Sequence, residues 1–254
     1  MSVQLSVVIP AYNEEKVIGT TISKVAPYLE ARGENELIVV DDGSRDGTAE
    51  VVKDLMSEYR CLRLVQNGRN GGKGRAVKEG ILQSQGEYVL YTDADLVYPI
   101  EGAEPFMAAL KDGASVAIGN RSHPDTLFAL NPRHFSYIYQ RYLVGRAYIF
   151  IVNLLLGLRV EDTQCGFKLF RGDVARDIFS RTRTYNFAFD VEAIHIARLL
   201  GYRIVELPVY FLYLGEQSSV ELIRDSFQMF GALLEIRRKG KRGVYSTPHL
   251  DPSL

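Results

Sequence analysis

Two aspartates separated by one residue follow an apolar segment of the chain. Asp93 and Asp95 come directly after EYVLYT, with Ala94 between them. Side chains two positions apart in an extended chain point to the same side, so both carboxylates can bind one hard divalent cation. We expect Asp95 to be a direct ligand of Mg²⁺ or Mn²⁺, and Asp93 to be a second ligand or a nucleotide contact, with water and a diphosphate as further ligands. The alternative is a polar loop with two solvated acids, because an Asp-x-Asp triplet also arises by chance.

A second acidic pair closes another apolar segment, LIVV. Asp41 and Asp42 lead into GSRDGT, in which glycines permit a tight turn and polar residues can cap a helix. One of the two carboxylates can accept a hydrogen bond from a base N–H or a ribose hydroxyl. The alternative is that both aspartates only stabilise the turn.

A glycine-rich segment, NGGKGR at 70–75, opens a predicted helix. Free backbone N–H groups at a helix N-terminus bind phosphate, and Lys73 could add a positive charge there. The segment is not a Walker A loop, because Asn67 stands five residues before Gly72 and Gly74 occupies the place of Ser or Thr. The first predicted strand ends in PAYNE rather than in a glycine fingerprint, which argues against a Rossmann-type dehydrogenase.

These motifs lie at the ends of predicted strands and helices. Short apolar segments typical of strands occupy residues 5–10, 37–41, 62–66, 88–92 and 115–119, and helix-period segments separate most of them. This alternation predicts a mainly parallel, doubly wound α/β sheet with helices on both faces. Because such sheets bind ligands at the carboxyl ends of their strands, the acidic pairs lie where a site is expected.

The second half of the chain has a different character. No acidic residue occurs between Thr126 and Val160, where arginines punctuate an aromatic and aliphatic stretch that predicts a long helix with basic and apolar faces. We expect a strand-like segment at 163–170, helices near 174–180 and from 190, a strand at 203–209 and a last helix near 220–238. No repeat or linker divides the chain, so a single domain over 1–254 is predicted.

The composition excludes several classes of protein. The 254 residues include 30 Lys and Arg against 31 Asp and Glu, a balance that does not predict nucleic-acid binding. Two cysteines, Cys61 and Cys165, are too few for a disulfide framework and are not spaced as zinc ligands. No apolar run approaches the ~20 residues of a membrane span, and no secretion signal is expected from the N-terminal sequence. A cytoplasmic location is therefore predicted.

The order of the short motifs resembles a known enzyme family. PAYNE ends the first predicted strand, DDGSRDGT follows the second, GGKG opens a helix and DAD follows the fourth strand. Together they resemble the inverting, GT-A-fold glycosyltransferases of family 2, which transfer a sugar from a nucleotide diphosphate-sugar. The resemblance implies that Asp93 and Asp95 hold the metal and the diphosphate, with Lys73 near the base or the phosphates. The other substrate contacts that it implies are Pro10, Ala11, Tyr12, Glu14, Ala94 and Asp42 or Asp41.

Motifs of the second half resemble one branch of that family. GNR at 119–121, LGLR at 156–159, DTQCGFKLF at 162–170 and FDVE at 189–192 are similar to enzymes that move mannose or glucose onto a lipid monophosphate such as dolichyl phosphate. The last two motifs are closer to the dolichyl-phosphate β-glucosyltransferases. Mannosyl members generally continue the triplet as DADLQ, whereas Val97 stands in the place of the Gln here.

The expected reaction is therefore transfer of glucose from UDP-glucose to a polyprenyl phosphate. Two enzymatic alternatives are a GDP-mannose-dependent polyprenyl-phosphate mannosyltransferase and a family 2 transferase with a soluble acceptor. A third alternative, from a different class, is a non-catalytic protein that binds a nucleotide-sugar. Within the expected enzyme, we assign residues 1–120 to the nucleotide-sugar and 121–254 to the acceptor.

Four more charged residues are candidates for this reaction. Asp190, in FDVE, could act as a general base or orient the acceptor; the alternative is an acid that offsets a helix dipole. Arg121 could bind the diphosphate, and Arg133 or Arg141 the acceptor phosphate, because guanidinium groups match phosphate oxygens. For Arg133 and Arg141 the alternative is a solvated side chain.

Two segments combine basic and apolar residues in a way that favours a membrane surface. They are the acid-free stretch and the last predicted helix, which runs into RRKGKR at 237–242. Such helices lie in the headgroup zone of anionic membranes, and the resemblance to enzymes with lipid acceptors favours this over simple core packing. We expect a peripheral protein on the cytoplasmic face of a membrane, and leave open a separate membrane subunit as a partner.

Overall fold

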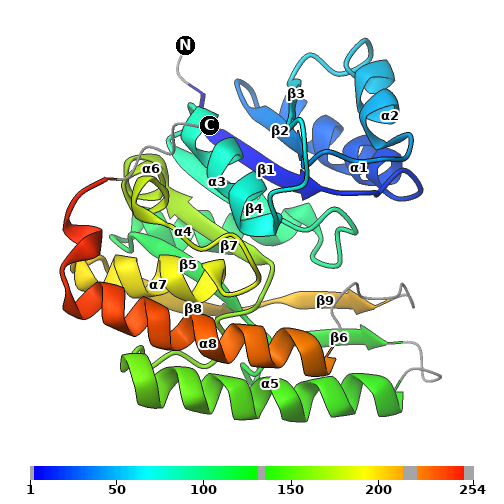
Figure 1. The fold of residues 1–254 in the computed structure, drawn as a ribbon. Helices are drawn as coiled ribbons and strands as arrows, with labels where there is room; N and C mark the ends of the chain where they lie inside the picture. Colours follow the sequence, from blue (N-terminus) through cyan, green and yellow to red (C-terminus); the bar gives the residue numbers. More distant parts are fainter. Residues whose placement is uncertain (1–2, 131–134, 214–221, 249–254) are drawn as a thin grey trace.

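The computed structural model describes residues 3–130, 135–213 and 222–248, with side chains described outside 130, 135–142, 213 and 222–229. A seven-stranded sheet in the order β3-β2-β1-β4-β7-β5-β8 forms its centre (Figure 1). The strands of this sheet are β1 (Leu5–Ala11), β2 (Glu36–Asp41), β3 (Leu62–Gln66), β4 (Tyr88–Thr92), β5 (Val116–Asn120), β7 (Phe167–Arg171) and β8 (Ile204–Pro208). The helices are α1 (Ile18–Glu30), α2 (Thr48–Leu55), α3 (Lys73–Gln83), α4 (Ala103–Lys111), α5 (Phe135–Leu156), α6 (Gly172–Arg181), α7 (Phe189–Leu199) and α8 (Leu222–Lys241).

The strands pair in parallel except for β7, which runs antiparallel between β4 and β5. The predicted mainly parallel sheet is therefore confirmed, and its strands come from both halves of the chain. The strand predicted at 163–170 is wrong over its first part, since β7 begins at Phe167 and 163–166 form a loop. This loop lies beside the carboxyl end of β4, where it contributes to the candidate site described below.

Continuous apolar runs form the central strands because helices cover both faces of the sheet. Successive residues of β1 alternate between two buried clusters, with Val7 and Ile9 in one and Val8 in the other. The first cluster includes α1 and α4, and the second includes α3, α6 and α7. Apolar side chains on both faces of the sheet are thus removed from water. This hydrophobic burial is the main contribution to the stability of the sheet.

The acid-free stretch forms a strand and a helix rather than one helix. Its first part is β6 (Leu127–Leu130), which pairs in parallel with β9 (Tyr210–Tyr213) in a separate two-stranded sheet. The helix α5 follows and packs beside α8 along one edge of the molecule (Figure 1). Apolar residues surround α5 rather than gathering on one side, so the prediction of separate basic and apolar faces is wrong for this helix.

A close approach of α3 to the sheet gives a stability prediction. A Cβ at Gly80 would overlap Val8 and lie 2.9 Å from Val40 Cγ2, whereas Gly145 in α5 has no atom within 4 Å of such a Cβ. We expect Gly80→Ala to lower the free energy of unfolding by about 1–3 kcal/mol through overpacking. The control, Gly145→Ala, should raise it by up to ~1 kcal/mol because alanine favours a helix. Urea unfolding followed by circular dichroism measures both, and equal stability of the two variants would contradict the packing argument.

Candidate active site

The loops that follow β1 and β2 are tied to each other at the carboxyl edge of the sheet. The backbone N–H of Asn13 donates to Ser44 Oγ at 2.9 Å, and that of Arg45 donates to Asn13 Oδ1 at 2.8 Å. Asn13 has a φ of 57°, and Leu96, directly after the acidic triplet, has a φ of 47°. Such conformations are costly for residues other than glycine and cluster at functional sites. Both strained residues lie next to predicted site residues.

The paired aspartates after β2 already have partners within the chain. Asp41 Oδ1 accepts from the Ser44 N–H at 3.0 Å, which stabilises the turn. Asp42 accepts from the N–H groups of Gly71, at 3.0 Å, and Gly72, at 2.7 Å, and from Asn67 Nδ2 at 2.9 Å. The prediction of free N–H groups for phosphate in the glycine-rich segment is therefore wrong at these two glycines. Their hydrogen bonds instead hold that segment against the end of β2.

Lys73, at the start of α3, brings the predicted charged residues together. Its Nζ lies 2.5 Å from Asp93 Oδ1, and both side chains are 28% exposed. Burial lowers the pKa of Lys73, but the attraction of Asp93, Asp190 and Asp95 outweighs it, so the pKa lies above its usual value. The ammonium group therefore stays charged, and it is attracted by acids of the loop after β4 and of α7.

A buried ion pair lies next to this cluster. Asp190, in the first turn of α7, accepts from Lys168 Nζ at 2.6 Å and from the Tyr91 hydroxyl, both at Oδ1. Lys168 on β7 is fully buried and is the register partner of Tyr91 on β4. Burial and the charge of Asp190 raise the pKa of Tyr91 well above its usual value, so its hydroxyl remains a donor. Asp190 is thus more than an exposed helix-end acid, because buried donors fix its carboxylate.

Lys168 and Tyr91 are not among the site residues predicted from the sequence. The one available signal was a lysine between two apolar residues of the segment FKLF, since a buried lysine needs a partner. That partner is 22 residues away in the sequence and could not be chosen from it.

Arg121 pairs with an acid of the DTQCG loop, residues 161–166, which precedes β7. Its Nε and Nη2 donate to the two carboxylate oxygens of Asp162 at 2.7 and 2.9 Å. Burial raises the pKa of Asp162, but the Arg121 charge and hydrogen bonds outweigh it, so the pKa lies below its usual value. Contact of Arg121 with a diphosphate stays a prediction.

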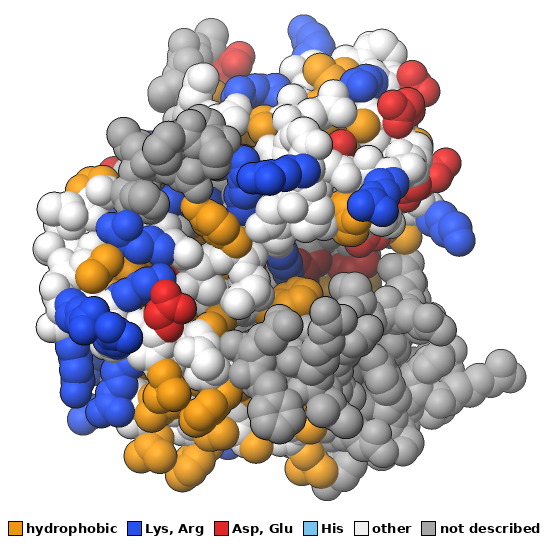
Figure 2. Space-filling view, in the orientation of Figure 1, with side chains coloured by type: hydrophobic (Ala, Val, Ile, Leu, Met, Phe, Trp, Pro, Cys, Tyr) orange, Lys and Arg blue, Asp and Glu red, His pale blue; other side chains and the backbone are white. Residues whose placement is uncertain are grey.

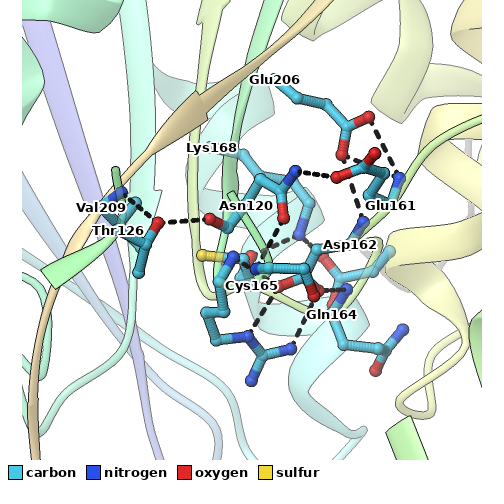
Figure 3. A network of polar contacts seen from close by, with 12 residues as sticks. Asn120, Thr126, Glu161, Asp162, Gln164, Cys165, Lys168, Glu206 and Val209 are labelled. Atoms are coloured by element: carbon cyan, nitrogen blue, oxygen red, sulfur yellow. Dashed lines mark hydrogen bonds and ion pairs between the residues drawn. The ribbon is translucent and has the colours of Figure 1, made fainter. Parts of the chain in front are cut away.

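A polar network fixes the rest of this loop (Figure 3). Asn120 Nδ2 donates to Glu161 Oε2 at 2.9 Å, and Glu206 of β8 accepts from the N–H groups of Glu161 and Asp162. On the other side, Lys168 Nζ donates to the Cys165 carbonyl at 2.6 Å. The loop is therefore held by β5, β7 and β8 at once.

The loop also abuts the acidic triplet. A Cβ at Gly166 would overlap the carboxylate of Asp93. A glycine is needed here for space rather than for backbone conformation, because Gly166 is not among the described glycines with positive φ. The position of Asp93 is thus set by Lys73 on one side and by the loop backbone on the other.

The remaining predicted residues are placed as follows. Tyr12 is exposed at the end of β1, whereas Pro10, Ala11 and Ala94 are buried. The Glu14 N–H donates to Thr48 Oγ1 at 2.8 Å, which joins the β1 loop to α2. Arg133 and the side chain of Arg141 lie outside the described residues.

The family model described as glycosyl transferase family 2 matches residues 6–179. The chain belongs to glycosyltransferase family 2. The dolichyl-phosphate beta-glucosyltransferase of Homo sapiens is 34% identical over 95% of this chain and 77% of its own length. That of Saccharomyces cerevisiae is 33% identical over 95% and 76%, and ALG5C of Trichomonas vaginalis is 33% identical over 83% and 64%.

Solved structures support the fold. Glucosyl-3-phosphoglycerate synthase from Mycobacterium tuberculosis, in complex with Mn²⁺, UDP and glucosyl-3-phosphoglycerate, superposes with a TM-score of 0.68 at 21% identity, over 92% of this chain and 80% of that chain. The predicted GT-A fold and the predicted resemblance to dolichyl-phosphate β-glucosyltransferases are both confirmed.

Asp93 and Asp95 can supply two oxygen ligands to a divalent cation. The diphosphate of a glycosyltransferase's donor substrate would supply further oxygen ligands. Among the residues that the structure describes, no group of three His, Cys, Asp or Glu side chains could hold a metal by itself. Mg²⁺ and Mn²⁺ accept one or two carboxylates when phosphates and water supply the other oxygens. Asp95 is exposed and Asp93 is half-buried beside it, so this oxygen donor set fits such a cation.

Gly166 gives a direct test of how this family 2 glycosyltransferase positions Asp93. We expect Gly166→Ala to displace the Asp93 carboxylate and to weaken binding of Mn²⁺ with UDP about tenfold or more, as loss of support around a metal ligand does. Isothermal titration calorimetry measures the affinity. Gly68→Ala is the control, because a Cβ there meets no atom within 4 Å. Unchanged affinity in Gly166→Ala would show that the loop does not position Asp93.

Proposed function

We propose that this glycosyltransferase transfers glucose from UDP-glucose, with inversion, onto the phosphate of a dolichyl-type polyprenyl phosphate. The observation that carries the proposal is the cluster of Lys73, Asp93, Asp95 and Asp190 at the carboxyl edge of the sheet. It occurs in a chain whose matched relatives from Homo sapiens and Saccharomyces cerevisiae are both dolichyl-phosphate beta-glucosyltransferases.

The chemistry is a single displacement. An oxygen of the acceptor phosphate forms a bond to the anomeric carbon as the bond from that carbon to the diphosphate breaks, and UDP leaves. Asp93 and Asp95 would hold a Mg²⁺ or Mn²⁺ ion, which supplies Lewis-acid neutralisation of the diphosphate charge. Lys73 adds a fixed positive charge from the chain itself, next to Asp93.

Asp190 has a positioning role in this proposal. A phosphate monoester is largely ionised near neutral pH, so it attacks without a general base, unlike an alcohol. The Asp190 carboxylate is engaged by Lys168 and Tyr91, and its charge acts on Lys73. We therefore assign it to orienting Lys73 and the acceptor rather than to taking a proton.

The acceptor side of the chain carries exposed apolar and basic residues. In α5, Phe150 is 69% and Leu154 is 72% exposed, and in α8 Phe230 and Leu234 are also exposed. Figure 2 shows apolar side chains gathered along this lower edge, next to Lys and Arg side chains. The basic group at the end of α8 is Arg237, Arg238, Lys241 and Arg242, which line one hollow with Leu234.

This combination favours docking on an anionic membrane surface, where the lipid acceptor resides. No helix in the described part of the chain has the length and hydropathy to cross a bilayer. The proposal places residues 121–254 against the acceptor and the membrane, on the cytoplasmic face, where two free cysteines suit a reducing compartment.

The reaction is tested by transfer of radiolabelled sugar into organic-extractable polyprenyl phosphate, with UDP-glucose and GDP-mannose in parallel. We expect metal-dependent labelling from UDP-glucose, abolished by EDTA, and a loss of about 100-fold or more in Asp95→Asn. Asp125→Asn is the control, because that carboxylate is 81% exposed and lies outside the cluster. Label from GDP-mannose alone would replace glucose by mannose. No lipid label from either donor, with the chain folded and supplied with metal, would refute this reaction in favour of another donor or a soluble acceptor.

Membrane docking is tested by cosedimentation with phosphatidylserine vesicles. We expect binding in low salt and release in high salt, because the attraction to anionic lipid is screened. Replacing Arg237 and Arg238 by Glu should weaken binding at least about tenfold. The same reversal at Lys24 and Lys53, exposed on α1 and α2, is the control. Equal loss in both double variants would indicate a general charge effect instead of a docking surface.

A further inference from the structure

The segment after α8 folds back onto α6 and α7. Figure 1 shows the C-terminal end of α8 turning upward beside α7 and toward α6. A short 3-10 helix, Val244–Ser246, follows Gly243, whose φ of 68° makes the turn. Tyr245 in this helix is only 2% exposed and belongs to the same buried cluster as α3, α6 and α7. The segment is therefore part of the core rather than a loose tail.

Hydrogen bonds from α6, α7 and the loop between them anchor this segment. The Tyr245 hydroxyl donates to Glu192 Oε1 at 2.8 Å, and Arg181 Nη1 donates to the carbonyls of Tyr245, at 2.9 Å, and Ser246, at 2.7 Å. Burial, and then the charge of Glu192, raise the pKa of Tyr245 above its usual value. The hydroxyl consequently remains a hydrogen-bond donor at all physiological pH values.

Glu192 connects Tyr245 to the loop between α6 and α7. It is fully buried, and its Oε2 accepts from the N–H groups of Arg183 and Thr184, both at 2.8 Å. A buried carboxylate is costly unless it is fully hydrogen-bonded, so its oxygens strongly constrain the groups that donate to them. Tyr245 and the loop amides therefore share one carboxylate.

The same loop, residues 182–186, contacts the residues on both sides of Lys73. The carbonyl of Tyr185 accepts from the Gly74 N–H at 2.9 Å, and Lys78 Nζ of α3 donates to the Thr182 carbonyl at 2.9 Å. A Cβ at Gly72 would lie 2.5 Å from the Tyr185 carbonyl oxygen. The glycines on both sides of Lys73 thus contact this loop directly, and a shift of the loop would move Lys73 relative to Asp93.

We propose that Tyr245 and Glu192 are positioning residues that, through the 182–186 loop, set Lys73 for the diphosphate of the donor. The C-terminal segment then controls donor binding without touching the donor. This inference rests on the function proposed above, because it assumes a nucleoside diphosphate next to Lys73. It also links the basic end of α8, the proposed membrane contact, to the donor site through hydrogen bonds of Tyr245, Glu192 and the Tyr185 carbonyl and the backbone between them.

The test is the affinity for UDP with Mn²⁺ in Tyr245→Phe, which removes one hydroxyl and keeps the ring. Tyr202→Phe is the control, since the Tyr202 hydroxyl donates to Asp177 Oδ2 of α6 at the same 2.8 Å rather than to Glu192. We expect a larger loss of thermal stability in Tyr245→Phe, because its hydroxyl serves a fully buried carboxylate, whereas Tyr202 is only half-buried. Only Tyr245→Phe should bind UDP more weakly, by about fivefold, a typical size for coupling through a packed network.

Glu192→Gln is a second variant in case Tyr245→Phe does not fold. It keeps an oxygen for the two amides but loses the charge, so we expect a weakening in the same direction. Amide hydrogen exchange at 183–186 and 72–76 should be faster in both variants and unchanged in Tyr202→Phe. Wild-type affinity in both folded variants would overturn the proposal, as would equal weakening in Tyr202→Phe. If the wild-type chain binds no UDP, the donor proposed above is wrong and this inference fails with it.

Discussion

The ion pair between Lys73 and Asp93 is the contact on which the candidate site depends. It joins the start of α3 to the loop that follows β4, the next strand along the chain. Neither partner is placed by this contact alone. Asp42 and the Tyr185 carbonyl hold the glycines around Lys73, while the backbone at Gly166 limits where the Asp93 carboxylate can lie. A charge pair with 28% of each side chain exposed contributes little to folding stability by itself. The contacts that hold Lys73 and Asp93 in place are therefore better explained by function.

A second, deeper pair reinforces the first. Lys168 and Asp190 are almost entirely removed from water, and Tyr91 donates to the same carboxylate oxygen. Burying such a pair costs desolvation energy that the attraction repays only with good hydrogen bonds, and removing one partner leaves an uncompensated charge. In this chain the pair fixes two elements near the site, because Lys168 also binds the Cys165 carbonyl of the loop that contacts Asp93. The cost in folding stability of burying this pair is offset by the fixed position that it gives to Asp190, a trade that is typical of active sites.

The sheet continues without a break from the donor half into the acceptor half. β7 lies between β4 and β5, and the DTQCG loop before it is bonded to β5 and β8. The acidic triplet and the elements of the second half are therefore joined by one sheet rather than by a linker. A transferase that joins a water-soluble donor to a lipid acceptor needs this arrangement, since both substrates must meet at one atom.

The sequence by itself determined the elements that depend on local pattern. It placed strands at 62–66 and 88–92 with the bounds that the structure has, located the acidic and glycine-rich motifs at their ends, and identified the family. Periodicity and turn chemistry are local properties, so they can be recognised along the chain. The antiparallel course of β7 and the small sheet of β6 and β9 were not predicted, because pairing partners lie far apart in sequence.

Tertiary structure alone decided which polar groups meet. Tyr91 and Asp190 are 99 residues apart, and Tyr245 and Glu192 are 53 apart. Each of these residues has many potential partners by type, and only the packed sheet and helices select one. The same reason explains why the N–H groups of Gly71 and Gly72 donate to Asp42. The local motif had predicted that they were free to bind phosphate. Composition and spacing thus defined the chemistry available to this chain, while the topology of the sheet determined the geometry in which it is held.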